Sequence, residues 1–222
     1  MSRAGAIPTL AREHAAWSGR ALLVGVDEVG RGPLAGPVVA AAVAFPPHTA
    51  PVPGVRDSKT LSPRQRAALA PGLWQAALAV SLGGASVREI DRFNIRRATA
   101  LAMRRAVTRL VRSVAFRSGA ARCGAAGWRI LIDGLPMPEC GFAHEALVEG
   151  DVHCYSIAVA GILAKETRDR LMRRLAARYP AYGWDSNAGY GTSHHCEAIT
   201  EHGPTPHHRR SFAPIAQWPL GL

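Results

Sequence analysis

Two short apolar runs joined by a glycine- and proline-rich turn constrain the fold of this chain most strongly. The runs cover residues 22–26 and 38–45, and the turn between them covers residues 30–37. Apolar runs of this length, bounded by turn residues, are typical of strands whose side chains are buried. We therefore expect the two runs to be neighbouring strands. Three further strands are predicted, at residues 79–85, 128–132 and 146–148.

Helices are predicted between and after these strands. Ser62 followed by Pro63 is a typical helix start, with the serine as N-cap and the proline in the first turn. We therefore expect a helix over residues 62–70. Because strands alternate with helices, the pattern indicates an α/β fold. The other predicted helices cover residues 95–116, 156–178 and 192–202.

The helix predicted over residues 156–178 has the clearest periodicity. Its apolar residues recur at helical spacing, so we expect them to form one buried stripe. At about 100° per residue, Asp169 falls almost opposite Leu171 and is predicted to lie outside that stripe. The stripe consists of Ile157, Ala164, Leu171 and Leu175.

The chain is expected to have one core between a leader and a C-terminal extension. Residues 1–20, rich in Ala and Arg, are predicted to be a flexible leader, residues 21–180 the core, and residues 181–222 the extension and tail. The leader lacks a continuous apolar segment and no apolar stretch is long enough to span a bilayer, so we expect a cytoplasmic protein without membrane contact. The cysteines lack CxxC spacing and are predicted to be reduced thiols. They are Cys123, Cys140, Cys154 and Cys196.

The chain carries a strong excess of positive charge. Its 27 Lys and Arg residues against 16 Asp and Glu residues give a formal net charge of +11. A basic surface attracts polyanions, because phosphates that are neutralised release their counterions. The charge therefore predicts a nucleic-acid partner, and it says nothing about the reaction.

Four carboxylates are candidates for metal-dependent chemistry. Asp27 and Glu28 follow the first predicted strand. Asp133 ends a later strand, and Asp169 lies on the long helix. Two Mg²⁺ ions about 4 Å apart, held by oxygen ligands, catalyse the hydrolysis of a phosphodiester. Each residue also has a plainer interpretation, since Asp133 before a glycine is typical of a turn and Asp169 has basic neighbours at helical spacing. Spacing alone leaves both interpretations open.

A set of short motifs extends along most of the chain in a fixed order. Together these motifs, over about residues 22–215, resemble ribonuclease HII, the type 2 ribonuclease H family. One motif such as GYGT carries little weight, whereas the ordered set is highly specific. The motifs are GVDEVGRGPLAGPV from residue 25, DSKTLS from 57, Asn94-Ile95, Ala98-Thr99 with Ala102-Met103, IDG from 132, GD from 150, Ala164-Lys165 with Thr167-Arg168-Asp169, GYGT from 189, GPTP from 203 and HRRSF from 208.

The resemblance implies a fold and an activity. The fold is a ribonuclease H-like mixed β-sheet flanked by helices, here over residues 21–180, with a substrate-binding C-terminal helical extension over residues 181–222. The activity is metal-dependent hydrolysis of the RNA strand of RNA–DNA hybrids, and nicking of duplex DNA 5′ of an embedded single ribonucleotide. The expected products carry 5′-phosphate and 3′-hydroxyl ends, and the enzyme is expected to be a monomer.

The resemblance also implies roles for individual residues. Gly30-Arg31-Gly32 resembles the family's ribonucleotide-sensing loop, and glycines do let backbone amides approach a 2′-hydroxyl closely. Four acids are implied to bind two Mg²⁺ or Mn²⁺ ions, with the first of them as the usual bridging ligand. These acids are Asp27, Glu28, Asp133 and Asp169.

Further residues are implied as substrate contacts. Tyr190 resembles the family's tyrosine that stacks on the sugar at the RNA-to-DNA junction. Lys59 and Lys165 are candidate phosphate contacts, and Arg209 and Arg210 are weaker candidates. A contact with a replication clamp through the apolar tail at residues 217–220 is left open.

The chain departs from the family's pattern at several positions. His153 and Ala188 stand where lysine is usual, Gly161 where serine is frequent, and Glu166 where valine is frequent. These changes spare all four acids but remove positive charge near the presumed substrate groove. We therefore expect them to affect substrate affinity and metal preference.

The sequence disfavours four alternatives, one of which, a structural or scaffold role, has no feature in its favour. A catalytically inactive binder of the same fold is disfavoured, because a protein that only binds phosphate gains nothing from clustered acids. Another nuclease or integrase with an acidic ribonuclease H-like site does not need a 2′-hydroxyl sensor. Ribonuclease HIII has an extra N-terminal substrate-binding domain, for which we expect the leader to be too short.

Overall fold

A five-stranded mixed sheet forms the centre of the molecule in this computed structural model, which describes residues 7–118 and 127–217. The strand order is β3-β2-β1-β4-β5. β1 pairs antiparallel with β2, and β2 with β3, whereas β4 is parallel to β1 and β5 is parallel to β4. All five predicted strands are confirmed. Their bounds are β1 Ala21–Val29, β2 Val38–Ala44, β3 Ala79–Ala85, β4 Gly127–Asp133 and β5 Glu145–Leu147.

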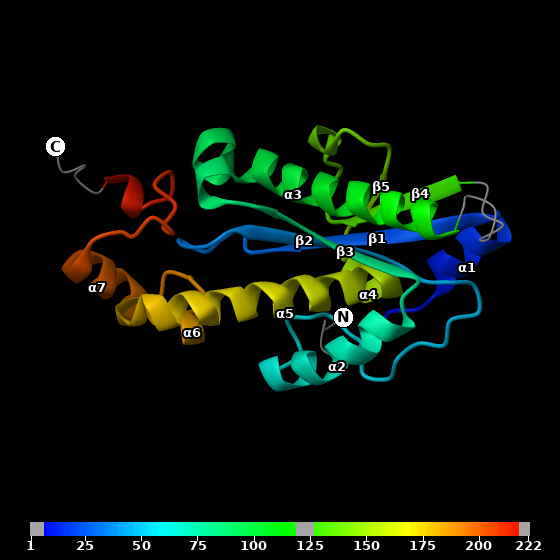
Figure 1. Cartoon of the computed structure of the whole chain (residues 1–222), viewed down its shortest axis with the longest axis horizontal. Coiled ribbons are helices and arrows are strands. Elements are labelled where there is room, and N and C mark those ends of the chain that lie inside the picture. The colour runs from blue at the N-terminus through cyan, green and yellow to red at the C-terminus, as the bar shows by residue number, and fades with distance from the viewer. Residues whose placement is uncertain (1–6, 119–126, 218–222) are drawn as a thin grey trace.

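Helices cover both faces of the sheet, as Figure 1 shows: α3 lies over one face and α5 over the other, with α2 beside α5. Both faces of β2 are therefore buried. Its even-numbered residues pack into the core under α3, and its odd-numbered residues pack into the core under α5. A fully buried strand has no polar face, which explains why residues 38–45 are continuously apolar. The mixed α/β fold predicted from the sequence is confirmed. These three helices are α2 Pro63–Ala76, α3 Val87–Ser118 and α5 Tyr155–Arg178.

Two helices are longer than predicted. In α2, Ser62 and Gln65 form a reciprocal capping box, and the helix continues past Pro71 to Ala76. The helix expected from residue 95 begins at Val87 and contains a break at Asn94, whose backbone is left-handed at φ 66°. Asparagine tolerates this conformation, and the Asn94 side chain accepts a hydrogen bond from the amide of Arg97, which starts the second segment.

The buried side of α5 differs from the predicted stripe. Every residue from Tyr155 to Ala164 is buried, because this half lies between the sheet and α2. Beyond it the buried residues are Arg168, Met172 and Ala176, whereas Leu171 is 36% exposed. The prediction of Leu171 as a stripe residue is wrong, because this half of α5 turns the side that carries Arg168 and Met172 toward the interior.

The prediction of a flexible leader over residues 1–20 is wrong for residues 11–18. These form helix α1, Ala11–Ser18, which packs on β1 at the end of the sheet opposite α7 (Figure 1). Glu13 is fully buried and accepts hydrogen bonds from the Ser156 amide at 2.8 Å and the Ser156 hydroxyl at 2.6 Å. The negative side chain thus caps the positive N-terminal end of α5. Residues 1–6 lie outside the described residues.

The C-terminal segment packs against the far end of α5. Trp184 is fully buried there, with Met172, Tyr182 and Ile199 in the same apolar cluster. The predicted helix at residues 192–202 is confirmed, with Thr192 as its N-cap. The remaining elements are α4 Gly150–His153, α6 Trp184–Asn187, α7 Ser193–His202 and the 3-10 helices η2 Pro138–Cys140, η3 Pro180–Tyr182 and η4 Ile215–Gln217.

Two further sequence predictions concern the whole chain. No helix within residues 7–118 and 127–217 has the length and apolar character needed to cross a bilayer. The predicted reduced state is confirmed for Cys140, Cys154 and Cys196, which are free thiols. Cys123 lies outside the described residues.

Candidate active site

Asp27 and Asp133 lie side by side on two parallel strands. β1 and β4 are paired with Val26 opposite Ile132, and the two aspartates are the next residue on each strand. The sequence suggested that Asp27 follows the end of the strand. β1 continues to Val29, so Asp27 lies within it. The register of the sheet therefore holds these two carboxylates as direct neighbours.

α5 runs along β1 in the same direction. A Cβ added to Gly25 would overlap the backbone of Ile157, one on Gly161 would overlap the carboxylate of Asp27, and one on Gly30 would overlap the side chain of Arg168. Successive residues of β1 thus contact successive turns of α5. Because Gly30 contacts Arg168, the next residue of α5, Asp169, lies near the loop that follows β1. Gly161, where the family often has serine, leaves the space that the Asp27 carboxylate fills.

The acids on the two strands repel one another. Burial, and then the charges of Glu28 and Asp133, raise the pKa of Asp27 well above its usual value. Burial also raises the pKa of Glu28, although Arg31, 3.3 Å away, counteracts this effect. Asp133 accepts a hydrogen bond from the Gly150 amide at 2.7 Å. This group has more negative charge than its neighbours neutralise.

Asp151 is a further acid in this group, and the sequence analysis did not select it as a site residue. Burial and the charge of Asp133 raise the pKa of Asp151, and Lys59 lies 3.4 Å from its carboxylate. For Lys59, burial lowers the pKa, but the charges of Asp151, Asp57 and Asp27 outweigh it and raise the pKa overall. The Gly-Asp motif at residue 150 was the available signal, since it belongs to the ordered set of motifs.

Asp169 is held by two cations. Arg66 approaches one carboxylate oxygen at 3.0 Å and Lys165 approaches the other at 2.6 Å. Lys165 lies four residues before Asp169 and could be expected as its partner, whereas Arg66 comes from α2 and no motif indicated it. Arg173 does not pair with the Asp169 carboxylate, because it forms an ion pair with Glu166 at 3.2 Å. That pair gives the unusual Glu166 a structural partner.

The loop at Gly30-Arg31-Gly32 and Tyr190 are close together. Gly30 has φ +91°, and a Cβ on Gly32 would lie 3.7 Å from the ring of Tyr190. Tyr190 is 44% exposed, so its ring is available to a partner. Arg209, a candidate phosphate contact, is fully buried and binds carbonyl oxygens of this loop, so that prediction is wrong. The neighbouring Arg210 is exposed.

Comparison with known proteins identifies the family of the chain. The family model described as Ribonuclease HII matches residues 24–215. The chain belongs to the ribonuclease HII family. It is 49% identical to the Ribonuclease HII of Synechococcus sp. (strain JA-3-3Ab) over 217 residues, which cover 96% of this chain and 92% of that protein.

Solved structures share the ribonuclease HII fold at low sequence identity. The ribonuclease H2 from Pyrococcus horikoshii OT3 superposes with a TM-score of 0.68 and 23% identity, over 88% of this chain and 96% of that one. Bst-RNase HIII in complex with Mn²⁺ superposes with a TM-score of 0.69 and 21% identity, over 95% of this chain and 72% of that one. The predicted ribonuclease H-like mixed sheet is therefore confirmed.

Membership of the ribonuclease HII family establishes the class of reaction. The chain is a divalent-metal-dependent endoribonuclease that hydrolyses the RNA strand of RNA–DNA hybrids. Within residues 7–118 and 127–217, no three His, Cys, Asp or Glu side chains are close enough to hold an ion as they stand. The donor set nevertheless fits a divalent cation, because it consists of hard carboxylate oxygens whose mutual repulsion an ion would relieve.

Proposed function

We propose that this member of the ribonuclease HII family also nicks duplex DNA on the 5′ side of a single embedded ribonucleotide, leaving 5′-phosphate and 3′-hydroxyl ends. The observation that carries this proposal is the position of the 30–32 loop beside Tyr190, at the end of the strand that bears Asp27 and Glu28. A site that recognises one 2′-hydroxyl next to the acids can select the bond to be cut.

The proposed ligands for two Mg²⁺ or Mn²⁺ ions are Asp27, Glu28, Asp133 and Asp169. Two metal ions bound by these carboxylates would supply an activated water and stabilise the leaving oxygen. The β1–β4 pairing, in which Val26 lies opposite Ile132, supports a joint role for Asp27 and Asp133 as ligands. Asp169 lies on a different element, and its ion pairs with Arg66 and Lys165 hold its carboxylate in place. Asp151 is proposed as a further acid that assists this set, because the charge of Asp133 acts on it.

Selectivity for the ribonucleotide is proposed to come from backbone amides and one ring. The amides of the 30–32 loop can donate to a 2′-hydroxyl, which deoxyribose lacks. The exposed face of Tyr190 can pack on the next sugar, and a planar ring tolerates deoxyribose at that position. Together the two contacts favour a ribonucleotide followed by DNA.

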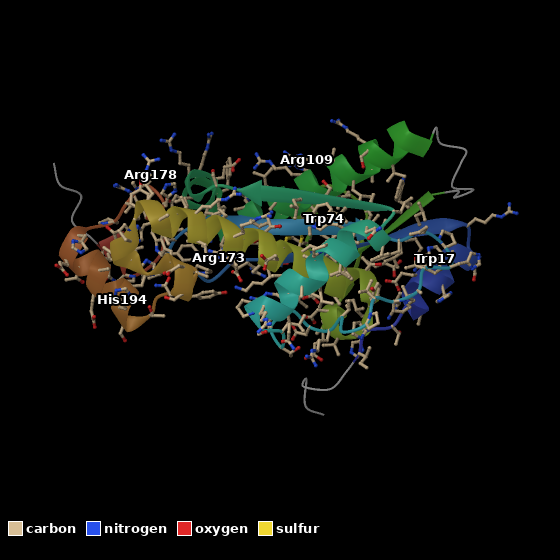
Figure 2. The ribbon with its side chains drawn as sticks, turned by 60° about the horizontal axis from the view of Figure 1, so that its bottom comes forward. Trp17, Trp74, Arg109, Arg173, Arg178 and His194 are labelled. Atoms are coloured by element: carbon tan, nitrogen blue, oxygen red, sulfur yellow. The ribbon has the colours of Figure 1, made fainter. Side chains whose placement is uncertain are left out.

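Basic side chains are proposed to hold the duplex. Lys59 is exposed beside Asp151, and Lys165 lies beside Asp169, so each can contact a phosphate near the acids. Figure 2 shows Arg109 on α3 and Arg173 and Arg178 on α5, all exposed side chains that add to the positive field around the molecule. Nucleic acid is attracted by such a field from any direction.

Several organisational predictions are kept as part of this proposal. Residues 21–180 are proposed as the catalytic core and residues 181–222 as the substrate-binding extension of a monomeric cytoplasmic enzyme. A replication-clamp contact through residues 217–220 also stays a prediction. Gln217 is the last described residue of that segment.

The test is cleavage of a DNA duplex that carries one ribonucleotide, with Mg²⁺ or Mn²⁺, beside an all-DNA duplex and an RNA–DNA hybrid. We expect a nick 5′ of the ribonucleotide and none in the all-DNA duplex. Asp27→Asn protein is expected to cut nothing while it still binds the hybrid. Hybrid cleavage without cleavage at the single ribonucleotide would contradict the proposed selectivity but leave the family activity intact.

A further inference from the structure

Two arginines are buried beneath the 30–37 loop, and no carboxylate within residues 7–118 and 127–217 forms an ion pair with either of them. Arg168 and Arg209 are both fully buried, and Arg209 has a pKa lowered to about 9 by burial and by the charge of Arg168. Arg209 therefore keeps its charge at neutral pH. Burying a guanidinium is costly unless its donors are satisfied, so the partners of these two side chains indicate what they are for.

The donors of both arginines are satisfied by main-chain carbonyl oxygens of the loop. Arg209 donates to the carbonyl oxygens of Arg31 at 2.7 Å and Gly36 at 2.8 Å, and also to that of Gly30. Arg168 donates to the carbonyl oxygens of Ala35 and Pro37, each at 3.0 Å. The backbone of the loop is thus turned with its oxygens toward the interior.

This orientation decides which way the amides of the loop point. In a trans peptide, the carbonyl oxygen of one residue and the N–H of the next lie on opposite sides. Because Arg209 holds the carbonyl oxygens of Gly30 and Arg31 inward, the N–H groups of Arg31 and Gly32 point away from it. Within the described residues, no acceptor binds either of these amides.

The same arginines join this loop to the segment that carries Tyr190. Arg168 donates to the carbonyl oxygen of Ala188 at 2.9 Å. The Gly189 carbonyl oxygen in turn accepts from the amide of Leu34 at 2.8 Å. The amide of Arg209 donates to the Leu34 carbonyl oxygen at 2.8 Å, which ties the C-terminal segment to the same loop. One hydrogen-bonded unit therefore sets the position of both proposed ribonucleotide contacts.

We infer that Arg168 and Arg209 are positioning residues for ribonucleotide selectivity. They do not touch the substrate. They hold the loop so that the Arg31 and Gly32 amides face the 2′-hydroxyl, and they fix Tyr190 relative to those amides. The inference rests on the proposed selectivity and deepens it, because it names the residues that orient the sensor. Lysine cannot replace either one, since it cannot donate to several divergent carbonyl oxygens from one plane.

The test measures binding, so that catalysis does not enter. Asp27→Asn protein is titrated with a DNA duplex carrying one ribonucleotide and with the matched all-DNA duplex. The readout is the Kd for the all-DNA duplex divided by the Kd for the ribonucleotide duplex. Arg209→Lys and Arg168→Lys are each made in this background. Arg112→Gln, which removes an exposed charge on α3, is the matched control.

We expect both lysine variants to reduce the ratio by about tenfold, the effect of losing one hydrogen bond to the 2′-hydroxyl, with binding to all-DNA changed by less than about twofold. The control is expected to keep the ratio. If a folded lysine variant keeps the ratio, or loses affinity for both duplexes equally, the inference is overturned. If the Asp27→Asn protein with both arginines intact already gives a ratio of one, the proposed selectivity itself fails.

A second measurement covers the case in which the lysine variants do not fold. Amide hydrogen exchange of Arg31 and Gly32 is followed in the protein with both arginines intact. We expect rapid exchange in the free protein and in the all-DNA complex, and protection in the complex with the ribonucleotide duplex. Protection in the free protein would overturn the inference, because the amides would then already have an internal acceptor.

Discussion

Asp27 and Asp133 occupy adjacent positions on parallel strands, and the charge of Asp133 contributes to the raised pKa of Asp27. Burial is the first cause of the raised pKa of Asp27, and Glu28 and Asp133 follow. A group whose folded pKa is raised binds its proton more tightly in the folded protein than in the unfolded chain. Stability is therefore lost as the pH rises through the folded pKa.

The first prediction is that Asp27→Asn stabilises the metal-free protein while it abolishes cleavage. At pH 8 we expect the free energy of unfolding to rise by about 0.5–2 kcal/mol, the range of a stabilising single substitution. Urea unfolding in the presence of a chelator measures this. Asp185→Asn, at an exposed position on α6, is the control and is expected to change stability by less than about 0.5 kcal/mol. A destabilised Asp27→Asn protein would show that favourable contacts of the Asp27 carboxylate outweigh the effects of its burial and of the neighbouring acids.

The second prediction concerns the response to metal. A ligand that binds only the folded state raises Tm in a concentration-dependent way. Mg²⁺ or Mn²⁺ is expected to raise the Tm of the protein, and the increase is expected to shrink in Asp27→Asn and to persist in Asp185→Asn. Equal increases in Tm for the unsubstituted protein, Asp27→Asn and Asp185→Asn would mean that the ions bind at a site that does not include Asp27.

The third prediction is that Arg66 is essential for holding Asp169. Arg66 is nearly buried and also donates to the carbonyl oxygens of Ser58 and Leu61. Removing one partner of a buried ion pair costs about 3–5 kcal/mol, so we expect Arg66→Ala to lower the free energy of unfolding by that amount. Arg64→Ala, two residues away and exposed, is the matched control.

A double-mutant cycle tests the same pair directly. If Arg66 acts on Asp169, then Arg66→Ala costs less in an Asp169→Asn background, with a coupling energy of about 0.5–3 kcal/mol. Strict additivity of the two substitutions would show that Arg66 stabilises only its own surroundings.

The fourth prediction tests the docking of α1. Glu13 accepts two hydrogen bonds from Ser156, and both donors lose their partner in Glu13→Ala. We expect a loss of about 1–3 kcal/mol in the free energy of unfolding. Arg12→Ala on the exposed side of α1 is the control. Unchanged stability in Glu13→Ala would restore the flexible-leader prediction.

Two buried histidines form a chain of hydrogen bonds behind Tyr190. The Thr205 amide donates to Nδ1 of His208 at 2.9 Å, so His208 carries its proton on Nε2, which lies 3.1 Å from Nε2 of His195. Trp184 donates to that same nitrogen of His195, whose Nδ1 therefore donates to the Tyr190 carbonyl oxygen at 2.8 Å. Both rings are neutral in this arrangement, and a further proton on His208 would displace the Thr205 amide.

The fifth prediction is a loss of stability in acid that depends on His208. Burial and the neighbouring His195 lower the pKa of His208 to about 3. The unfolded chain then binds a proton that the folded protein does not, so the stabilising contribution is complete above about pH 6.5 and is lost as the pH falls toward 3. The slope is at most about 1.4 kcal/mol per pH unit.

The measurement is the difference in free energy of unfolding between the protein and its His208→Asn variant from pH 8 to pH 4.5. This difference cancels the contribution of the carboxylates, which titrate in both proteins. We expect the advantage of histidine to shrink below about pH 6.5. A difference that stays constant with pH would mean that His208 is not held neutral in the folded protein.

Local sequence predicted the elements of this fold well, because strands and helix starts depend on neighbouring residues. The apolar residues 38–45 and the Ser62-Pro63 start needed no distant partner to be recognised. Periodicity failed at Leu171 because the second half of α5 buries a different side, on which Arg168 binds carbonyl oxygens of the 30–37 loop. The burial of Glu13 as a cap of α5 could not be predicted from local sequence either, since its partner Ser156 lies 143 residues away.

The sequence by itself determined the strands, the family motifs and the set of acids, because these are properties of short segments in a fixed order. Only the tertiary structure decided how the acids are supported. Arg66 meets Asp169 across 103 residues, and Arg209 meets Gly30 across 179. In the amino-acid sequence, an arginine that becomes a surface charge looks the same as an arginine that is buried and positions a loop. What distinguishes them is desolvation, which depends on everything that packs around the side chain.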